Sequence, residues 1–561
     1  MDLNEQGLLA QDGVAPSEGS PQFHQQMVYA VAMNTIAHFE RALGRAVLWS
    51  PRTRPKARAG HRRRSPSFVR KLRMYPHALR QPNAYYDAEK KAILFGYFPA
   101  SADPGRNLPG GMVFTCLSQD IIAHETTHAI LDGIHPHYME PTNADALAFH
   151  EAFADIVALF QHFSHAEALS HQIAKTRGDL TRQNLLGELA QQFGEATGRY
   201  GALRSAIGQV NPATQQWEPI QPDPAALGRA TEPHERGAIL VAAVFDTFLT
   251  IYKARVTDLI RIATDGTGKL PEGDIHPDLV GRLAAEAGKA AEHVLQMCLR
   301  ALDYCPPFDV SSGEFLRAII TADYDLLPDD PRSYRIAVIE AFRRRGIHPS
   351  DVRTLSQDSL RWSTTDLNLH DLDRSKGKSL FDQVVRGWRL REDREVIFNR
   401  MNTLGKVLGK IIRDASLSDR QQRELGIALG PRAKGVVHVN RAGDAELEVH
   451  SLRRARRISP DGRLKVDLVI ELMQTHRRPY GKGEPEWPPF RGGCTLIADP
   501  DEGHVRYCIS KDIRSVVRLE RQRAFLNSPQ GLPLQGAYFG DPRRQPSTAG
   551  LLAMLHEGEM Q

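Results

Sequence analysis

The segment from Ser118 to Ile134 constrains this chain most, because it places two histidines four residues apart in an apolar, helix-like run. His124 and His128 then share one helical face, with Cβ atoms about 5–6 Å apart. Two imidazoles at that spacing can reach one zinc ion. Glu125 lies beside such an ion, where a carboxylate serves as general base for a water molecule. The HETTH spacing therefore predicts a metal centre with His124 and His128 as ligands and Glu125 as the catalytic base.

A third ligand is expected downstream, in the segment His150-Glu151-Ala152-Phe153-Ala154-Asp155. Glu151 and Asp155 again lie four residues apart, among apolar neighbours that favour a buried helical face. A buried carboxylate needs a partner. We expect Glu151 to bind the metal and Asp155 to accept the free ring N–H of a ligand histidine. The alternative for both carboxylates is a solvated acidic face.

One other class of zinc site is excluded by counting. The pattern HExxHxxGxxH requires Gly and His at the third and sixth positions after the second ligand histidine. Leu131 and Ile134 occupy these positions, while Gly133 and His135 are both displaced. The remaining nearby histidines, including His150, are not expected to be ligands; most are expected either at the surface or behind the ligands, in contact with them.

These motifs together resemble the thermolysin-like family of zinc peptidases, the gluzincins, in which HExxH is followed by a ligand Glu in an ExxxD segment. Here the pattern reads HETTH, a slightly long gap, and EAFAD, and the resemblance covers roughly residues 80–348. It implies an α+β fold, a thermolysin-like zincin catalytic unit with a reduced β-rich N-terminal lobe and a helical C-terminal lobe, followed by a small antiparallel β domain. It also implies one zinc ion.

Further matches to this family lie outside the central motif. Asn83 and Ala84 correspond to an edge strand whose Asn side chain and Ala backbone hold the substrate main chain. Arg204 corresponds to the arginine that binds the substrate carbonyl beyond the scissile bond. His234 corresponds to the histidine that stabilises the tetrahedral intermediate, and Tyr138 to a second oxyanion donor.

The chain also departs from the family pattern. Asp120 matches one carboxylate of a paired calcium site, but the expected partner falls near His162, so we do not expect calcium. Arg229 stands where the family has the Asp that orients the catalytic histidine, and Glu232 is the candidate substitute. The family's secretion signal and propeptide are not found.

The activity implied by the resemblance is that of a metalloendopeptidase, in which Glu125 assists the attack of zinc-bound water on a peptide or protein substrate. Met112, Ile121 and Leu203 indicate an apolar residue just after the scissile bond. The alternative is a catalytically degenerate member that binds zinc and acts as a peptide-recognition or scaffold protein.

Periodicity divides the rest of the chain. Helical spacing is found at 25–46, 118–133, 144–163, 180–197, 236–254, 275–303, 312–324, 332–345 and 390–427, and strand-like alternation follows from about residue 434. We expect a flexible tail at 1–24, an N-terminal catalytic lobe at 25–163, a helical catalytic lobe at 164–350, a linker with helices at 351–433, an antiparallel β domain at 434–515 and a loosely ordered tail at 516–561. The β domain is a candidate for binding a protein partner or regulating activity.

Charge and cysteine content favour a cytoplasmic protein. The net charge is only +5 over 561 residues, and basic runs at 51–80 and 453–457 have little aromatic interleaving, so nucleic acid is not the expected partner. Five cysteines without a CxxC pair indicate free thiols. The amino terminus resembles no secretion signal, and no apolar run reaches the roughly 20 residues that span a bilayer.

Overall fold

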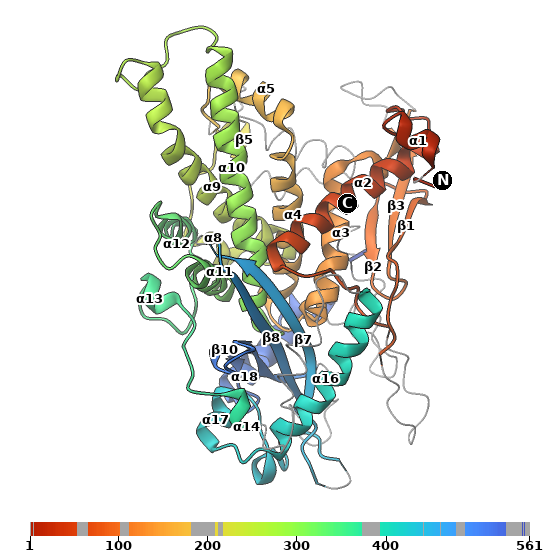
Figure 1. Ribbon diagram of the computed structural model, residues 1–561, viewed down its shortest axis with the longest axis vertical. Coiled ribbons are helices and arrows are strands. Elements are labelled where there is room, and N and C mark those ends of the chain that lie inside the picture. The colour runs from red at the N-terminus through yellow and green to blue at the C-terminus, as the bar shows by residue number, and fades with distance from the viewer. Residues whose placement is uncertain are drawn as a thin grey trace.

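The protein has a mixed α+β fold in the computed structural model (Figure 1). The structure describes residues 2–3, 5–52, 66–100, 111–180, 208–210, 217–372, 393–440, 443–459, 462–477, 489–534, 552–553 and 555. Two sheets of four strands flank a group of long helices in this part of the chain. The predicted α+β class is therefore confirmed.

The first sheet lies in the N-terminal part of the chain and consists of β1 (Arg73–Leu79), β2 (Ala84–Asp87), β3 (Ala92–Pro99) and β4 (Met112–Phe114). Its order is β1-β3-β2, with β4 also paired to β3. β2 runs antiparallel to β3, so that Tyr86 faces Ile93 in the register, whereas β1 runs parallel to β3. β2 thus ends the sheet on the side that faces α3.

The central helices carry the predicted metal motifs. α3 (Gln119–Ile134) begins where the Ser118 side chain accepts a hydrogen bond from the backbone N–H of Ile121. α4 (Ala144–His162) begins at Asn143, whose side chain caps Asp145 and Ala146. Such caps satisfy backbone N–H groups that have no partner within the helix. α3 packs against α4, and α4 packs against α9 (Pro233–Ala263).

The surrounding helices complete one large apolar core. These elements are α2 (Pro21–Leu43), α5 (Ala166–Thr176), α10 (Pro277–Ala301), α11 (Ser312–Leu326) and α12 (Tyr334–Arg344). By length and composition α9 is apolar enough to cross a membrane, but 72% of its apolar window is buried inside the protein. A core helix of a folded domain shows the same pattern.

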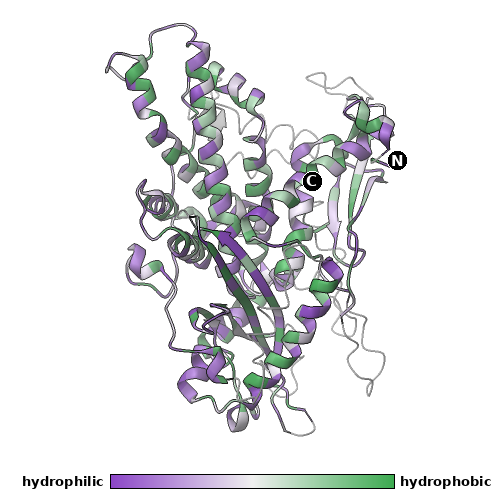
Figure 2. Ribbon diagram, in the orientation of Figure 1, coloured by the Kyte–Doolittle hydropathy of each residue, from purple (hydrophilic) through white to green (hydrophobic). Residues whose placement is uncertain are grey.

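The second sheet is antiparallel, in the order β10-β9-β8-β7. Its strands are β7 (Glu448–Ile458), β8 (Leu464–Thr475), β9 (Arg491–Ala498) and β10 (Val505–Lys511). Figure 2 shows the contrast between hydrophilic β7 and hydrophobic β8. α16 (Arg394–Asp414) packs against β7 (Figure 1).

This sheet is not the separate β domain expected at 434–515. Ala455, Val469 and Ile497 belong to the same core as α3 and α4. The alternate residues Leu468 and Ile470 point into a second cluster that α16 helps to form. Because successive strand residues face opposite sides, the sheet is buried on both faces, and one face shares the core of α3 and α4.

Both expected tails contain ordered structure. α1 (Gln6–Ala10) lies within the predicted 1–24 tail, and Ser20 caps α2 there. α18 (Val516–Leu526) lies within the predicted 516–561 tail, and its Leu526 is 3% exposed. The strand expected at 435–439 makes only isolated bridges. The helix expected at 180–197 lies outside the described residues, except for Leu180.

Candidate metal centre

Two histidines of α3 converge at the centre of the molecule. The Nε2 atoms of His124 and His128 lie 2.9 Å apart, and their rings meet edge to face. Both side chains are buried. The ligand atoms of His124, Glu125 and His128 all lie within 4.8 Å of one another. The structure therefore brings together the HExxH residues that the sequence analysis singled out.

Glu151 faces this pair from α4. Its Oε2 atom lies 3.3 Å from His124 Nε2 and 3.5 Å from His128 Nε2. The start of α4 is fixed by Asn143, whose amide donates to Asp309 Oδ1 at 2.6 Å. Two imidazole nitrogens and one carboxylate oxygen thus point at a common position, which is a donor set that zinc accepts.

The second nitrogen of each ligand histidine is held by a partner on α4. His124 Nδ1 lies 2.8 Å from Asp155 Oδ1, as the spacing of Glu151 and Asp155 predicts. His128 Nδ1 lies 2.7 Å from His150 Nδ1, in a stacked pair of rings. Such partners fix the tautomer that leaves Nε2 available for a metal. The sequence analysis left open whether His150 lies at the surface or behind a ligand, and the structure places it behind His128.

His234, near the start of α9, completes the cluster. Its Nε2 atom lies 3.5 Å from Glu151 Oε2, and its Nδ1 atom lies 2.8 Å from Glu232 Oε1. Glu232 also caps α9, because its Oε2 accepts from the backbone N–H of Glu235 at 2.9 Å. Glu232 therefore occupies the orienting role for which it was the candidate. Arg229 instead forms an ion pair with Asp223.

Tyr86 on β2 positions Glu125. The Tyr86 backbone N–H donates to Glu125 Oε2 at 2.8 Å, and its hydroxyl donates to Asp132 Oδ2 at 2.8 Å. Glu125 and Asp132 lie seven residues apart on α3. Tyr86 therefore holds two turns of this helix against the first sheet. Lys91 also contacts Asp132 at 2.8 Å.

Of the three residues predicted to bind substrate, two lie on or beside β2. Asn83 and Ala84 lie at the start of β2 and are both 1% exposed. The Asn83 amide donates to the carbonyl of Ala553 at 3.4 Å. Arg204 lies outside the described residues, so its role stays a prediction.

Tyr138 does not join the cluster. Its side chain is fully buried, its ring stacks on His135, and its hydroxyl donates to the Pro306 carbonyl at 2.6 Å. Because that contact uses the only proton of the hydroxyl, the geometry does not support Tyr138 as an oxyanion donor. Tyr138 lies in the short 3-10 helix Pro136–Met139, within the long gap between HETTH and EAFAD, where the match to the family is least defined.

Burial and close charges set the protonation states at the centre. Burial would lower the pKa of His124, but contacts with Asp155 and Glu151 raise it to about 10. Burial would raise the pKa of Glu151, but His128 and His124 hold it well below its usual range. Burial lowers the pKa of His128 and His150. One ionised carboxylate therefore faces one protonated and one neutral ring, and a bound cation would displace the proton.

Asp120 lies one turn before His124 on α3 and contacts His162, the residue that stands near the expected second carboxylate of a calcium pair. An imidazole is a poor ligand for calcium, which prefers oxygen atoms. The absence of calcium stays a prediction.

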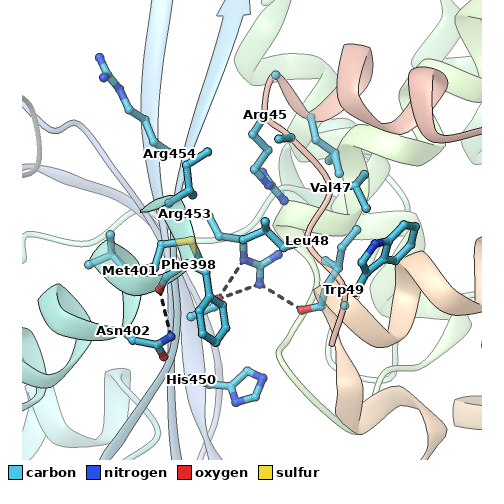
Figure 3. A pocket seen from close by; sticks show the side chains of 18 of the residues that line it. Arg45, Val47, Leu48, Trp49, Phe398, Met401, Asn402, His450, Arg453 and Arg454 are labelled. Carbon is cyan, nitrogen blue, oxygen red and sulfur yellow. Dashed lines mark hydrogen bonds between the residues drawn. The ribbon is translucent and has the colours of Figure 1, made fainter. Parts of the chain in front are cut away.

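A cavity of about 490 Å³ lies elsewhere, between the end of α2, α16 and β7 (Figure 3). Phe398, Met401 and Trp49 line it, whereas none of the residues of the candidate metal centre does. Arg453 crosses it to donate to the Ile134 carbonyl at 3.3 Å and to Ser451 Oγ at 2.8 Å. This cavity marks the junction of the second sheet with α3, at the opposite end of the helix from His124.

Comparisons with protein-family models, with curated proteins and with solved structures find no match for this chain.

Proposed function

We propose that this protein is a zinc-dependent endopeptidase of the thermolysin-like type, with the first sheet as a reduced N-terminal lobe and α9–α12 as the helical lobe. One observation carries the proposal. The Nε2 atoms of three histidines from two helices, His124, His128 and His234, lie within 3.5 Å of one carboxylate oxygen, Glu151 Oε2. Each histidine also has a partner on its other nitrogen.

His124, His128 and Glu151 would hold the zinc ion. The fit rests on the chemistry of the donor set, two imidazole nitrogens and one carboxylate oxygen, and on the Asp155 and His150 contacts that orient the rings. When bound, zinc supplies Lewis acidity that activates water and polarises a carbonyl.

Glu125 is the general base in this proposal. It lies beside the ligand histidines and is fixed by the Tyr86 N–H, so its carboxylate does not need to reorganise before it accepts a proton. After taking a proton from the attacking water, Glu125 passes it to the leaving amine. The reaction therefore balances with one water consumed per peptide bond.

His234 stabilises the oxyanion. Its Nδ1–H donates to Glu232, so its Nε2 can donate to substrate only when the ring carries both protons. The Glu232 carboxylate supports that state. Burial would raise the pKa of Glu232, but the hydrogen bond from His234 lowers it, so that the carboxylate stays ionised. A charged donor aimed at developing charge contributes most in the transition state.

Substrate would align along β2. Asn83 and Ala84 begin this edge strand, and Tyr86 connects it to Glu125. An extended peptide added to a sheet edge is held through main-chain hydrogen bonds. The proposed roles of Arg204, and of an apolar residue after the scissile bond, remain predictions within this scheme.

The direct test is Glu125→Gln. Zinc content should stay at the wild-type level, while kcat on a quenched peptide library should fall by about a hundredfold to ten-thousandfold. Glu235→Gln, at an exposed site on α9, is the matched control. Wild-type protein that holds stoichiometric zinc but hydrolyses no peptide would favour the scaffold alternative. Protein without zinc would overturn the proposal.

A further inference from the structure

The edge that would bind substrate is already in contact with the carboxyl-terminal end of the chain. The Asn83 amide donates to the Ala553 carbonyl across 470 positions of sequence. Leu552 is 1% exposed and Leu555 is 9% exposed, and both belong to the main core. We call Leu552, Ala553 and Leu555 the C-terminal segment.

This contact lies near the proposed general base, Glu125. Asn83 lies three residues before Tyr86, whose N–H holds Glu125. Any chain bound to Asn83 is therefore close to the proposed general base. The backbone of the C-terminal segment is helical, so it does not present the extended conformation that an added strand requires.

Only one of the two polar atoms of the Asn83 side chain takes part in this contact. Its Nδ2 donates to Ala553, whereas its buried Oδ1 has no hydrogen-bond partner among the described residues. An extended peptide can satisfy both atoms of an amide, through a carbonyl and an N–H. A substrate would therefore regain a hydrogen bond that the C-terminal segment leaves unmade, which makes the contact displaceable.

We propose that the C-terminal segment is an autoinhibitory occupant of the β2 edge, which competes with peptide substrate for Asn83. This inference rests on the proposed function. The apolar side chains of Leu552 and Leu555 anchor the segment, while the Ala553 carbonyl takes the Asn83 amide. Displacement by substrate, or by a partner that binds the carboxyl terminus, frees the edge.

The first experiment releases the segment without refolding the protein. A full-length chain with a site-specific protease sequence inserted after residue 540 is purified and then cut. We expect kcat/KM on a quenched peptide to rise about tenfold, as expected when about one molecule in ten is open beforehand. Leu552→Asp with Leu555→Asp should give the same rise, whereas Leu532→Asp, at a residue 53% exposed, should not.

The second experiment separates this inference from the proposed function. A labelled peptide of residues 546–561 is titrated into the cut and washed protein, and binding is read by fluorescence anisotropy. Binding that Asn83→Ala weakens supports the inference even if no variant hydrolyses peptides. Absence of binding overturns it, and so does an unchanged kcat/KM after cutting in protein whose activity depends on Glu125.

A second inference comes from a different cluster. His24 of α2, His77 of β1 and Cys116 of the 3-10 helix Thr115–Leu117 place one ligand atom each within 4.8 Å of one another. His24 Nδ1 lies 2.7 Å from His77 Nε2. Tetrahedral zinc with nitrogen and sulfur ligands needs separations of about 3.3–3.7 Å, so small ring rotations suffice.

The ring of His24 is oriented so that its Nδ1 atom can bind a metal ion. Its Nε2–H donates to the Glu18 carbonyl at 2.8 Å, which leaves a lone pair on Nδ1 directed at the cluster. The ring of Phe114 packs against both His24 and His77, with centroids at 4.6 and 5.3 Å. Cys116 is buried and adds a sulfur ligand to the two imidazole nitrogens.

The geometry points to a second zinc site at His24, His77 and Cys116, which would pin α2 to the first sheet. Elemental analysis should give two zinc ions per chain, with one lost in Cys116→Ser and the other in His124→Ala. After cobalt substitution, a thiolate-to-cobalt absorption band should vanish in Cys116→Ser and persist in Cys298→Ser, where a buried cysteine lies outside the cluster. Cobalt-loaded wild type without that band would overturn the inference.

Discussion

The Nδ1 atoms of His128 and His150 face each other at 2.7 Å, so one ring must donate its proton to the other. A ligand histidine that offers Nε2 to a metal carries its proton on Nδ1. In the proposed zinc site, His128 would therefore be the donor and His150 the acceptor. Burial holds the pKa of His150 well below its usual range, which keeps it neutral and able to accept.

His150→Ala should weaken zinc binding. The His128 ring would lose the acceptor that fixes its tautomer, and removal of such a partner typically costs about 10–100-fold in metal affinity. Competition with a chromophoric chelator measures the change. His171→Ala, at an exposed position on α5, serves as the control. Equal affinity in both variants would show that the His128–His150 contact has no role in ligation.

Glu232→Gln should lower kcat while KM changes little. Glu232 stabilises the doubly protonated ring of His234, which acts in the transition state rather than in substrate binding. The expected loss is about 10–100-fold, with the alkaline limb of the pH–rate profile moving to lower pH because the ring loses its proton more easily. Glutamine can still cap α9, so a matching drop in thermal stability would instead indicate a merely structural role.

The sequence predicted the two helices of the candidate metal centre because their signals are local. Ser118 and Asn143 cap the two helices, and the histidine spacing fixes a common face. It did not predict that His150 would orient His128, because that contact depends on how α4 is rotated against α3. Tyr138 was misplaced because the gap after HETTH shifted the alignment to a segment that is buried in the core.

The basic run of β7 has contacts that the sequence alone did not reveal. Arg453 and Arg457 share one strand face and are 6% exposed each. Arg457 pairs with Asp303 at 3.3 Å, and Arg45 binds the same carboxylate at 2.6 Å. This part of the run thus forms internal ion pairs that join the second sheet to the rest of the core. Its acidic partner lies about 150 positions away, where no sequence window can find it.

Asp303→Asn should destabilise the protein by about 3–5 kcal/mol, because it removes the buried carboxylate that Arg45 and Arg457 share. Burial would raise the pKa of Asp303, but Arg45 and Arg457 lower it. A lowered folded-state pKa stabilises the protein above the unfolded value of about 4, and this contribution is lost as the pH falls below that value. Urea unfolding at pH 7 and at about pH 3, below the unfolded pKa, checks both effects.

The comparison for this variant is Asp358→Asn. Asp358 forms an ion pair with Arg361, but its side chain is 86% exposed. An exposed pair contributes little to stability. If Asp303→Asn and Asp358→Asn lower the free energy of unfolding equally at pH 7, the buried ion pairs of Asp303 do not stabilise the attachment of the second sheet.

Removal of residues 434–561 should abolish folding rather than activate the enzyme. The idea of a detachable regulatory β domain predicts more activity from such a truncated chain. The structure argues otherwise, because Ala455, Val469 and Ile497 are each 0% exposed within the core that carries α3 and α4. Glu471 also contacts His135, just past the end of α3, at 3.1 Å. We expect the fragment to bind no zinc and to show no cooperative thermal transition by circular dichroism. A soluble, zinc-containing and active fragment would support the hypothesis of a detachable regulatory domain. If activity instead rises only when the C-terminal segment is released, regulation acts at the β2 edge.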